Sequence, residues 1–345
     1  MRRIYLIRHA MPDIPYGERW CVGGETDLPL NALGRMQAAL LPTLPELHGL
    51  QAVFCSTLSR ARETALPLCP APREIEGLEE QRMGVWDGLS FREIRERFPA
   101  LYAARENDLS VLPEGAESLE TVRARMWKAL RRCLRESEGD IAVVSHRTAL
   151  ASLIGRRELL LHASVSTLYW DGDAFETDSV GVRPHPPLTP ELAGSLLRAA
   201  APGERVEAHD RAVAAEALRI AQALPQRLDE ELLVSAALLH DVARAEKDHA
   251  GLGAAWLREL GFHEAAALVE RHHDWQGGAI DEAAVLYLAD KCVQEDRPVT
   301  VEERFAQSEA RCRTPEAKEA HAKRLQTAQR LRTAINEQCG YTLIR

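Results

Sequence analysis

The chain has 345 residues, of which 46% are apolar and 28% are charged, and its net charge at neutral pH is −9. This apolar fraction excludes a disordered chain, and the length exceeds the roughly 250–300 residues at which a single core stops growing, so we expect two domains. The acidic balance and the lack of any basic block argue against a nucleic-acid partner.

Membrane and secretion signals are also missing from the sequence. No apolar run approaches the ~18 residues of a membrane helix, and charge returns too soon after Met1 for a secretory signal. The seven cysteines are scattered, odd in number and never spaced as C-x-x-C. This spacing argues against a disulfide scaffold or a zinc-thiolate site, so we expect a cytoplasmic protein with no membrane partner.

Short β-type runs alternate with helical stretches in the first half of the chain. This alternation is typical of an α/β sheet domain, and Asp171-Gly172 predicts a hairpin turn near its end. The predicted strands cover residues 4–7, 52–55, 141–145 and 166–170.

Four prolines then fall within residues 184–190, a density that no helix or central strand tolerates. We therefore expect a first domain over residues 1–183, a linker over 184–190 and a second domain over 191–345. Helical periodicity dominates after the linker, which predicts an all-α second domain. Its clearest helical stretches are residues 207–224, 232–242, 283–288 and 317–335.

Basic side chains and histidines follow three of the predicted strands. Arg8 and His9 follow the first strand, Arg60 and Arg62 lie just after the second, and His146 follows the third. Ligands of open α/β sheets bind at the carboxyl ends of strands, so we expect one of the two later arginines to join the other three side chains. Planar guanidinium donors suit a phosphoryl group, and a neutral imidazole held among cations suits a nucleophile.

Five segments carry longer patterns around these residues. They are LIRHA at 6–10, GETDLPL at 24–30 with GRMQA at 34–38, STLSRARETA at 56–65, EQRMGVWDG at 80–88, and VVSH at 143–146. In this order they resemble the motifs of the histidine phosphatase superfamily, also called the phosphoglycerate mutase-like or RHG family. The resemblance covers roughly the first half of the chain.

The resemblance implies a three-layer α/β domain that needs no cofactor. His9 would be the phosphorylated nucleophile, and Arg8, Arg60 and His146 would hold the phosphoryl oxygens. Glu80 would be the proton donor, because its spacing from Gly84 matches the family pattern better than that of Glu79. The residues 21–30 look most like the α-ribazole-phosphatase branch, which implies a small phosphorylated metabolite as substrate.

Two departures from the family pattern lie beside the predicted nucleophile and its partner. Ala10 and Arg147 stand where most members have glycine. The core chemistry is therefore expected to be intact while the substrate-facing edge is altered. Arg147 either adds an anion contact or points away from the site.

A second set of histidines and aspartates lies on the predicted helices of the second domain. Imidazole nitrogens combined with carboxylate oxygens suit a divalent transition metal such as Mn, Fe, Co, Ni or Zn. The set comprises His209, His240, Asp241, His249, His272, His273 and Asp290.

The order H…HD…D in this set resembles the HD-domain phosphohydrolase superfamily. The resemblance maps the metal ligands onto His209, His240, Asp241 and Asp290. The three histidines between them, His249, His272 and His273, look like the additional ligands of the binuclear subgroup, with the choice between the last two left open. Such a site would hydrolyse nucleotide-like substrates.

The sequence thus predicts a bifunctional phosphohydrolase: a phosphomonoesterase acting through His9, followed by a metal-dependent HD phosphohydrolase. The alternative is a phosphoglycerate mutase-type phosphotransferase with a regulatory, nucleotide-sensing HD domain. The short stretch between Glu80 and His146 favours the phosphatase. The tail from Val301 to Arg345 is mostly helical and is expected either to pack on the helical domain or to form a homodimer.

Overall fold

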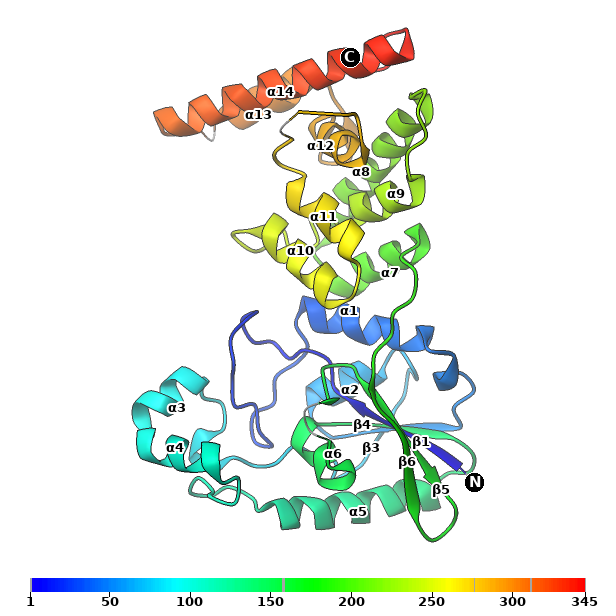
Figure 1. Cartoon of the computed structure of the whole chain (residues 1–345), viewed down its shortest axis with the longest axis vertical. Helices are drawn as coiled ribbons and strands as arrows, with labels where there is room; N and C mark the ends of the chain where they lie inside the picture. The colour runs from blue at the N-terminus through cyan, green and yellow to red at the C-terminus, as the bar shows by residue number, and fades with distance from the viewer. Residues whose placement is uncertain (1, 157–158, 276, 311, 345) are drawn as a thin grey trace. The chain divides into compact units, whose positions relative to one another are not determined.

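The computed structural model describes residues 2–156, 159–275, 277–310 and 312–344. The chain divides into two compact units, Met1–Pro186 and Pro187–Arg345 (Figure 1). No secondary-structure element lies between the last strand of the first unit, which ends at Val182, and the first helix of the second, which begins at Pro190.

The first unit is built on a sheet of order β3-β2-β4-β1-β5-β6. The first four strands of that order are mutually parallel, whereas β5 pairs antiparallel with β1, and β6 pairs antiparallel with β5 through the predicted Asp171-Gly172 turn. The four predicted strands are confirmed. The bounds are β1 Arg2–Arg8, β2 Ala52–Cys55, β3 Arg73–Glu74, β4 Ile141–Ser145, β5 Val165–Trp170 and β6 Phe175–Val182.

Alternate residues of each strand enter one of two cores on opposite faces of the sheet. Ile4 and Leu6 pack with apolar residues of α5 (Leu119–Arg135) and α6 (Arg147–Ile154). Tyr5 and Ile7 pack with residues of α1 (Ala32–Leu40) and α2 (Ser59–Ala65) on the other face. Each such buried side chain contributes about 1.5–3 kcal/mol of hydrophobic stabilisation. The predicted three-layer α/β domain is confirmed.

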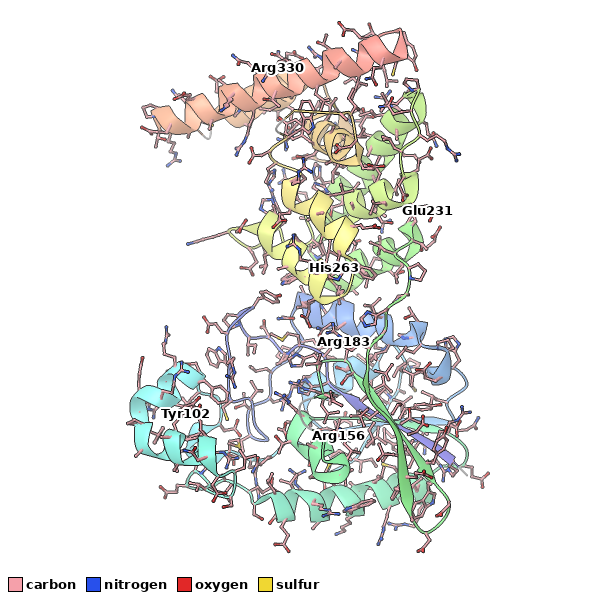
Figure 2. All side chains as sticks on the ribbon, viewed as in Figure 1. Tyr102, Arg156, Arg183, Glu231, His263 and Arg330 are labelled. Atoms are coloured by element: carbon pink, nitrogen blue, oxygen red, sulfur yellow. The ribbon has the colours of Figure 1, made fainter. Side chains whose placement is uncertain are left out.

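A small lobe projects from the segment between β3 and α5. It contains α3 (Phe91–Arg97) and α4 (Pro99–Asn107), and its own core surrounds Trp86 and Ile94 (Tyr102 of α4 is labelled in Figure 2). The side chain of Ser90 caps α3 in a reciprocal box with Glu93. Three short 3₁₀ turns complete the unit: Leu41–Thr43, Pro45–Leu47 and Gly84–Trp86.

The second unit is helical, as predicted. The helix α12 has every residue from Ala283 to Lys291 buried, so it forms the centre of this unit and brings Asp290 inside it. The helices are α7 Pro190–Ala200, α8 Glu204–Ala223, α9 Glu230–Leu239, α10 His249–Glu259, α11 His263–Arg271, α12 Glu282–Lys291, α13 Val301–Glu309 and α14 Pro315–Cys339.

One small hairpin interrupts the helices of the second unit. It pairs β7 (Val293–Gln294) with β8 (Arg297–Pro298) directly after α12. Strands of two residues carry no alternating pattern that a sequence could reveal. Within the described parts of the chain, none of the helices combines the length and the apolar character needed to cross a bilayer.

Candidate functional site

The carboxyl ends of three parallel strands meet at one edge of the sheet in the first unit. His9 follows β1, Ser56 follows β2 and His146 follows β4. The backbone N–H of His9 donates to the Ser145 carbonyl at 2.9 Å, and that of Ser56 donates to the Val144 carbonyl at 3.0 Å. The ring centroids of His9 and His146 lie 5.0 Å apart. The structure therefore brings the two predicted histidines together.

His9 is held in one tautomer by its own neighbour. Its Nδ1–H donates to the carbonyl oxygen of Ala10 at 2.7 Å, which leaves Nε2 as the ring's lone-pair nitrogen. Burial, followed by the positive charges of Arg60 and Arg8, lowers the pKa of His9 well below its usual value. The imidazole is therefore neutral at physiological pH.

Arg60 rather than Arg62 belongs to this site. Arg60 is fully buried, and its two terminal nitrogens donate to the carbonyl oxygens of Thr26 (2.7 Å) and Gly23 (3.0 Å). Arg62 is exposed and lies 3.5 Å from the carboxylate of Glu74. The alternative left open by the sequence is thereby settled in favour of Arg60 as the residue that lies among the histidines.

The loop that holds Arg60 is itself fixed by Asp87. The Asp87 carboxylate accepts hydrogen bonds from the backbone of Gly23 (2.9 Å) and Glu25 (3.1 Å) and from the Thr26 hydroxyl. The GETDLPL and EQRMGVWDG segments are thus joined through one side chain. Together they hold the backbone carbonyls of Gly23 and Thr26 in place to accept hydrogen bonds from the guanidinium of Arg60.

Glu80 and Glu79 point to different surroundings. The Glu80 carboxylate is buried and accepts from the backbone N–H groups of Thr148 (3.1 Å) and Ala149 (3.0 Å), in the first turn of α6 just after His146. Glu79 accepts from the Thr57 hydroxyl (2.9 Å) and from the backbone of Gly77. Glu80 is therefore the carboxylate that is hydrogen-bonded to the segment carrying His146.

The structure adds a third histidine that sequence reasoning missed. Nε2 of His162 lies 2.7 Å from Nη2 of Arg8, and its ring centroid lies 5.6 Å from that of His9. Burial, then the charges of Arg8 and Arg147, lower the pKa of His162 well below its usual value. No motif marks His162, which precedes β5 in an irregular segment.

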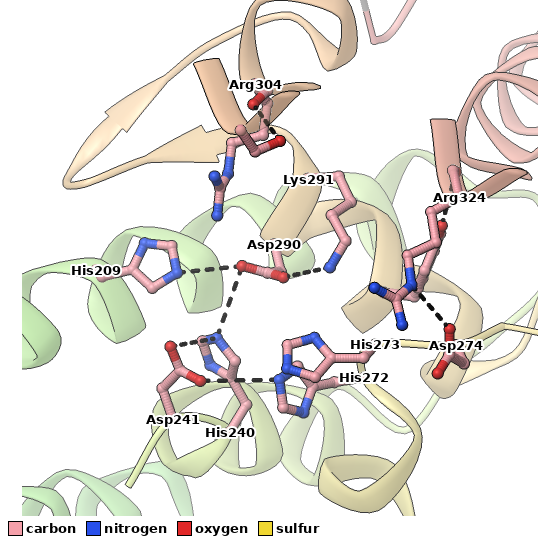
Figure 3. Close-up of polar contacts among 12 residues, drawn as sticks. His209, His240, Asp241, His272, His273, Asp274, Asp290, Lys291, Arg304 and Arg324 are labelled. Carbon is pink, nitrogen blue, oxygen red and sulfur yellow. Dashed lines mark hydrogen bonds and ion pairs between the residues drawn. The ribbon is translucent and has the colours of Figure 1, made fainter. Parts of the chain in front are cut away.

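All seven predicted ligands of the second unit converge on one place, here called the His–Asp cluster. Figure 3 labels every member of the cluster except His249. Three groups within it have ligand atoms within 4.8 Å of one another. The groups are His209 with His240 and Asp290, His240 with Asp241 and His272, and His249 with His272 and His273. They come from α8, the end of α9, the start of α10, the end of α11 and the end of α12.

The imidazoles in this cluster are oriented by backbone carbonyls behind them. Nδ1–H of His240 donates to Ala237 (2.7 Å), that of His272 donates to Val269 (2.6 Å), and that of His209 donates to Glu295 (2.8 Å). Each ring therefore turns Nε2 toward the cluster, which is how second-shell carbonyls orient metal-binding histidines. The Nε2 atoms of His240 and His272 are buried with no hydrogen-bond partner among the described residues.

The two carboxylates divide the cluster into two adjoining halves, one around Asp290 and one around Asp241. Asp290 lies 3.1 Å from Nε2 of His209 and 3.9 Å from Nε2 of His240. Asp241 lies 3.2 Å from Nε2 of His249 and 3.8 Å from Nε2 of His272. Partnerless imidazole nitrogens facing carboxylate oxygens form a donor set that fits a divalent metal, or two sharing Asp241.

Burial and neighbouring charges shift the pKa values of several residues in the cluster. Burial alone would raise the pKa of Asp241, but the imidazoles of His240 and His249 outweigh it and hold that pKa below the usual range. Burial lowers the pKa of His272 to about 2 and that of His273 to about 4. Both rings are therefore neutral at physiological pH, the form in which histidine binds a metal.

Asp210 is a further member that sequence reasoning missed. It is fully buried, and its Oδ1 lies 3.5 Å from Nδ1 of His240, behind the face that points into the cluster. Burial, followed by the charges of Asp241 and Asp290, raises the pKa of Asp210 well above its usual value. The signal was present in the sequence, since His209-Asp210 repeats the dipeptide His240-Asp241.

The family model for the histidine phosphatase superfamily (branch 1) matches residues 4–180, just over half of the chain, and the chain belongs to that superfamily. A model for the HD domain matches residues 206–294. Both predicted families are thereby confirmed, in the predicted order along the chain.

Individual relatives match about half of the chain. A "bifunctional protein" of Mycobacterium tuberculosis is 32% identical over 173 residues, which are 48% of this chain and 46% of that protein. The metal-independent phosphoserine phosphatase of Arabidopsis thaliana is 30% identical over 51% of this chain and 79% of its own. The alpha-ribazole phosphatase of Shigella flexneri has a TM-score of 0.46 at 24% identity, over 54% of this chain and 98% of its own. The chain spans a little under half the length of the first curated relatives it matches.

Proposed function

We propose that the first unit is a phosphomonoesterase that acts through a phosphohistidine on His9. The observation that carries this proposal is the orientation of His9, whose Nδ1–H is engaged by Ala10 while Nε2 remains available as nucleophile. Arg8, Arg60 and His146 would hold the phosphoryl oxygens. The alkoxide leaving group needs a proton, and Glu80 is the buried carboxyl group next to the segment that carries His146.

The reaction would proceed in two displacements. In the first, a bond forms between Nε2 of His9 and phosphorus while the ester P–O bond breaks, and the leaving oxygen takes a proton from Glu80. In the second, water loses a proton to Glu80 and attacks phosphorus, which releases inorganic phosphate and restores His9. The closeness of the His9 and His146 rings, whose centroids lie 5.0 Å apart, supports this sequence of steps.

The substrate would be a small phosphorylated metabolite, of the kind that α-ribazole-phosphatase-like enzymes accept. The residues 21–30 support this branch, and Arg8 and Arg60 form a local cationic group beside His9 in a chain whose net charge is −9. A local cluster of this kind suits one phosphoryl group better than an extended polyanion.

Turnover of p-nitrophenyl phosphate in excess EDTA tests the proposal. Wild type should release phosphate, and His9→Ala should abolish that release. His48→Ala is the matched control, because His48 is exposed and its ring contacts only the carbonyl of Pro42. EDTA-resistant activity in His9→Ala would overturn the phosphohistidine assignment. Phosphoryl exchange between phosphoglycerates without phosphate release would instead support the mutase.

We also propose that the second unit is a metal-dependent phosphohydrolase acting on nucleotide-like substrates. His209, His240, Asp241 and Asp290 would hold one divalent transition metal. A second ion would be held by Asp241 together with three histidines: His249, His272 and His273. When bound, such ions activate water and polarise phosphoryl oxygens. The partnerless Nε2 atoms of His240 and His272 support this role most directly.

Metal analysis of purified full-length protein tests the second proposal. His240→Ala and Asp241→Ala should each lower the metal content relative to wild type, while both remain folded by circular dichroism. His263→Ala is a suitable control, since His263 is exposed at the start of α11 (Figure 2). An unchanged stoichiometry in both cluster variants would contradict a metal site.

A further inference from the structure

A cavity of about 600 Å³ opens onto the His–Asp cluster of the second unit. Part of its lining consists of cluster residues, including His209, Asp241 and Asp290. Another part comes from α13 and α14, which lie beyond the residues 206–294 matched by the HD-domain model. The residues contributed by these two helices are Arg304, Phe305, Ser308, His321 and Arg324.

Most cations around this cavity already face a carboxylate. Three of them lie within ion-pair distance of acidic neighbours in the same lining, and Arg324 lies 3.1 Å from Asp274. The three pairs are Arg205 with Glu295, Arg244 with Asp241, and Lys291 with Asp290.

Arg304 differs from these cations. Its Nε is buried and has no hydrogen-bond partner among the described residues. Figure 3 shows its guanidinium extending from α13 toward the side of the cluster formed by His209 and Asp290. A buried N–H donor without an acceptor costs free energy, and an anionic ligand in the cavity would relieve that cost.

An aromatic surface adjoins Arg304 in the sequence and in the cavity. The rings of Phe305 and His321 pack edge to face with centroids 5.1 Å apart, and both residues line the cavity. The His321 ring is fixed by a 2.8 Å hydrogen bond between its Nε2 and the Ser308 hydroxyl. The cavity therefore has an aromatic part of its lining beside Arg304, and its volume suits a ligand of nucleotide size.

We propose that Arg304 binds a second phosphoryl group, so that the substrate of this unit is a nucleoside diphosphate or a longer phosphoanhydride rather than a monophosphate. This inference rests on the proposed function of the His–Asp cluster, which would hold the reacting phosphoryl group. Arg304 acts at the neighbouring phosphoryl group. The C-terminal helices thus determine how many phosphoryl groups the site prefers.

Calorimetric binding of α,β-methylene-ADP and of AMP tests the proposal, using the full-length protein in Mn²⁺ and again after chelation. The methylene bridge prevents cleavage between the two phosphoryl groups. The AMP arm uses the phosphonate analogue of AMP, in which carbon replaces the ester oxygen, so binding of both ligands is read without turnover. In Mn²⁺, wild type should bind the diphosphate analogue at least about tenfold more tightly than AMP, equivalent to about 1.4 kcal/mol. Arg304→Met should remove this preference and leave AMP affinity unchanged, while Arg304→Lys should keep part of it. After chelation, both affinities should fall while Arg304 still favours the diphosphate.

Arg330→Met is the matched control, because Arg330 lies on α14 and is not part of the cavity lining (Figure 2). Equal wild-type affinities for the two ligands, an equal loss of both in Arg304→Met, or loss of metal from Arg304→Met would each overturn the proposal. A wild-type preference for the diphosphate, lost in Arg304→Met but without any hydrolysis of ADP or ATP, would leave the subsite standing and contradict the hydrolase assignment instead.

Discussion

Nε2 of His162 accepts a hydrogen bond from Nη2 of Arg8 at 2.7 Å, while Nη1 of the same guanidinium donates to the carbonyl oxygen of Leu160 at 2.8 Å. Both terminal nitrogens of Arg8 are therefore anchored by the segment that precedes β5. Arg8 precedes the proposed nucleophile directly, so this anchor fixes the cation closest to His9 in the sequence. His162 is consequently a positioning residue for the first site.

Replacing His162 with Ala should lower kcat/KM for p-nitrophenyl phosphate about 10- to 100-fold, because a hydrogen bond to a charged group contributes about 1.5–3 kcal/mol. His162→Gln should recover part of this loss, since its amide oxygen can accept from Arg8. Steady-state kinetics and phosphate inhibition constants of both variants check the prediction. A His162→Ala enzyme with wild-type kcat/KM and wild-type phosphate inhibition would show that Arg8 needs no such anchor.

Three histidines of the first site predict an acid-sensitive unit: His9 and His146 are buried, and His162 is half-buried. The pKa values of His9, His146 and His162 are all lowered well below 6.5, mainly by burial and then by the nearby arginines. As pH falls below about 6.5, the unfolded chain binds protons that the folded unit does not bind, so stability is lost. Each neutral histidine accounts for up to about 1.4 kcal/mol per pH unit.

Native-state hydrogen exchange of the amides in β1 and β4 between pH 7.5 and 5.5 measures this loss for the first unit alone. The free energy of unfolding should fall with pH in wild type. Between pH 7.5 and 5.5 the total loss should be smaller by up to about 1.4 kcal/mol in His162→Gln, which removes one such group. His48→Gln should keep the wild-type slope because His48 is exposed. Equal slopes in all three proteins would contradict the prediction.

Sequence patterns predicted the strands and helices whose residues follow a regular apolar pattern. The strands at 52–55 and 141–145 were predicted with the bounds they have, because each is an uninterrupted β-type run next to a motif. The exposed two-residue strand β3 and the hairpin of β7 and β8 are too short to carry a pattern. β3 forms by pairing with β2, while β7 and β8 pair with each other.

The candidate sites divide in the same way. His9 and His146 follow strands and could be placed together from the parallel topology of the sheet. His162 and Arg304 stand in segments without a motif, and only the tertiary structure brings them to Arg8 and to the cavity. A lone histidine in a loop or a lone arginine on a helix has no local signal of such a contact.

The two candidate proton donors can be separated by leaving-group dependence. Glu80→Gln should reduce turnover of an alkyl phosphate far more than that of p-nitrophenyl phosphate, because a poor alkoxide leaving group needs the proton and nitrophenolate does not. The difference should be about 100-fold, the usual size of a general-acid contribution. Glu79→Gln should show no such difference, since Glu79 is engaged by Thr57 and Gly77. Equal losses on both substrates in Glu80→Gln would remove it as the acid.

His272 and His273 should differ in their effect on metal content. His272 is fully buried, and its Nδ1–H donates to the carbonyl of Val269. Among the residues that the structure describes, its Nε2 has no hydrogen-bond partner, and it belongs to two of the three ligand groups. Nε2 of His273 already lies 2.8 Å from Nε2 of His249, and His273 belongs to only one of the three groups found among the described residues. His272→Ala should therefore lower the metal bound per chain, measured by elemental analysis after gel filtration, more than His273→Ala. The opposite order would place His273, rather than His272, at the junction of the two halves of the cluster.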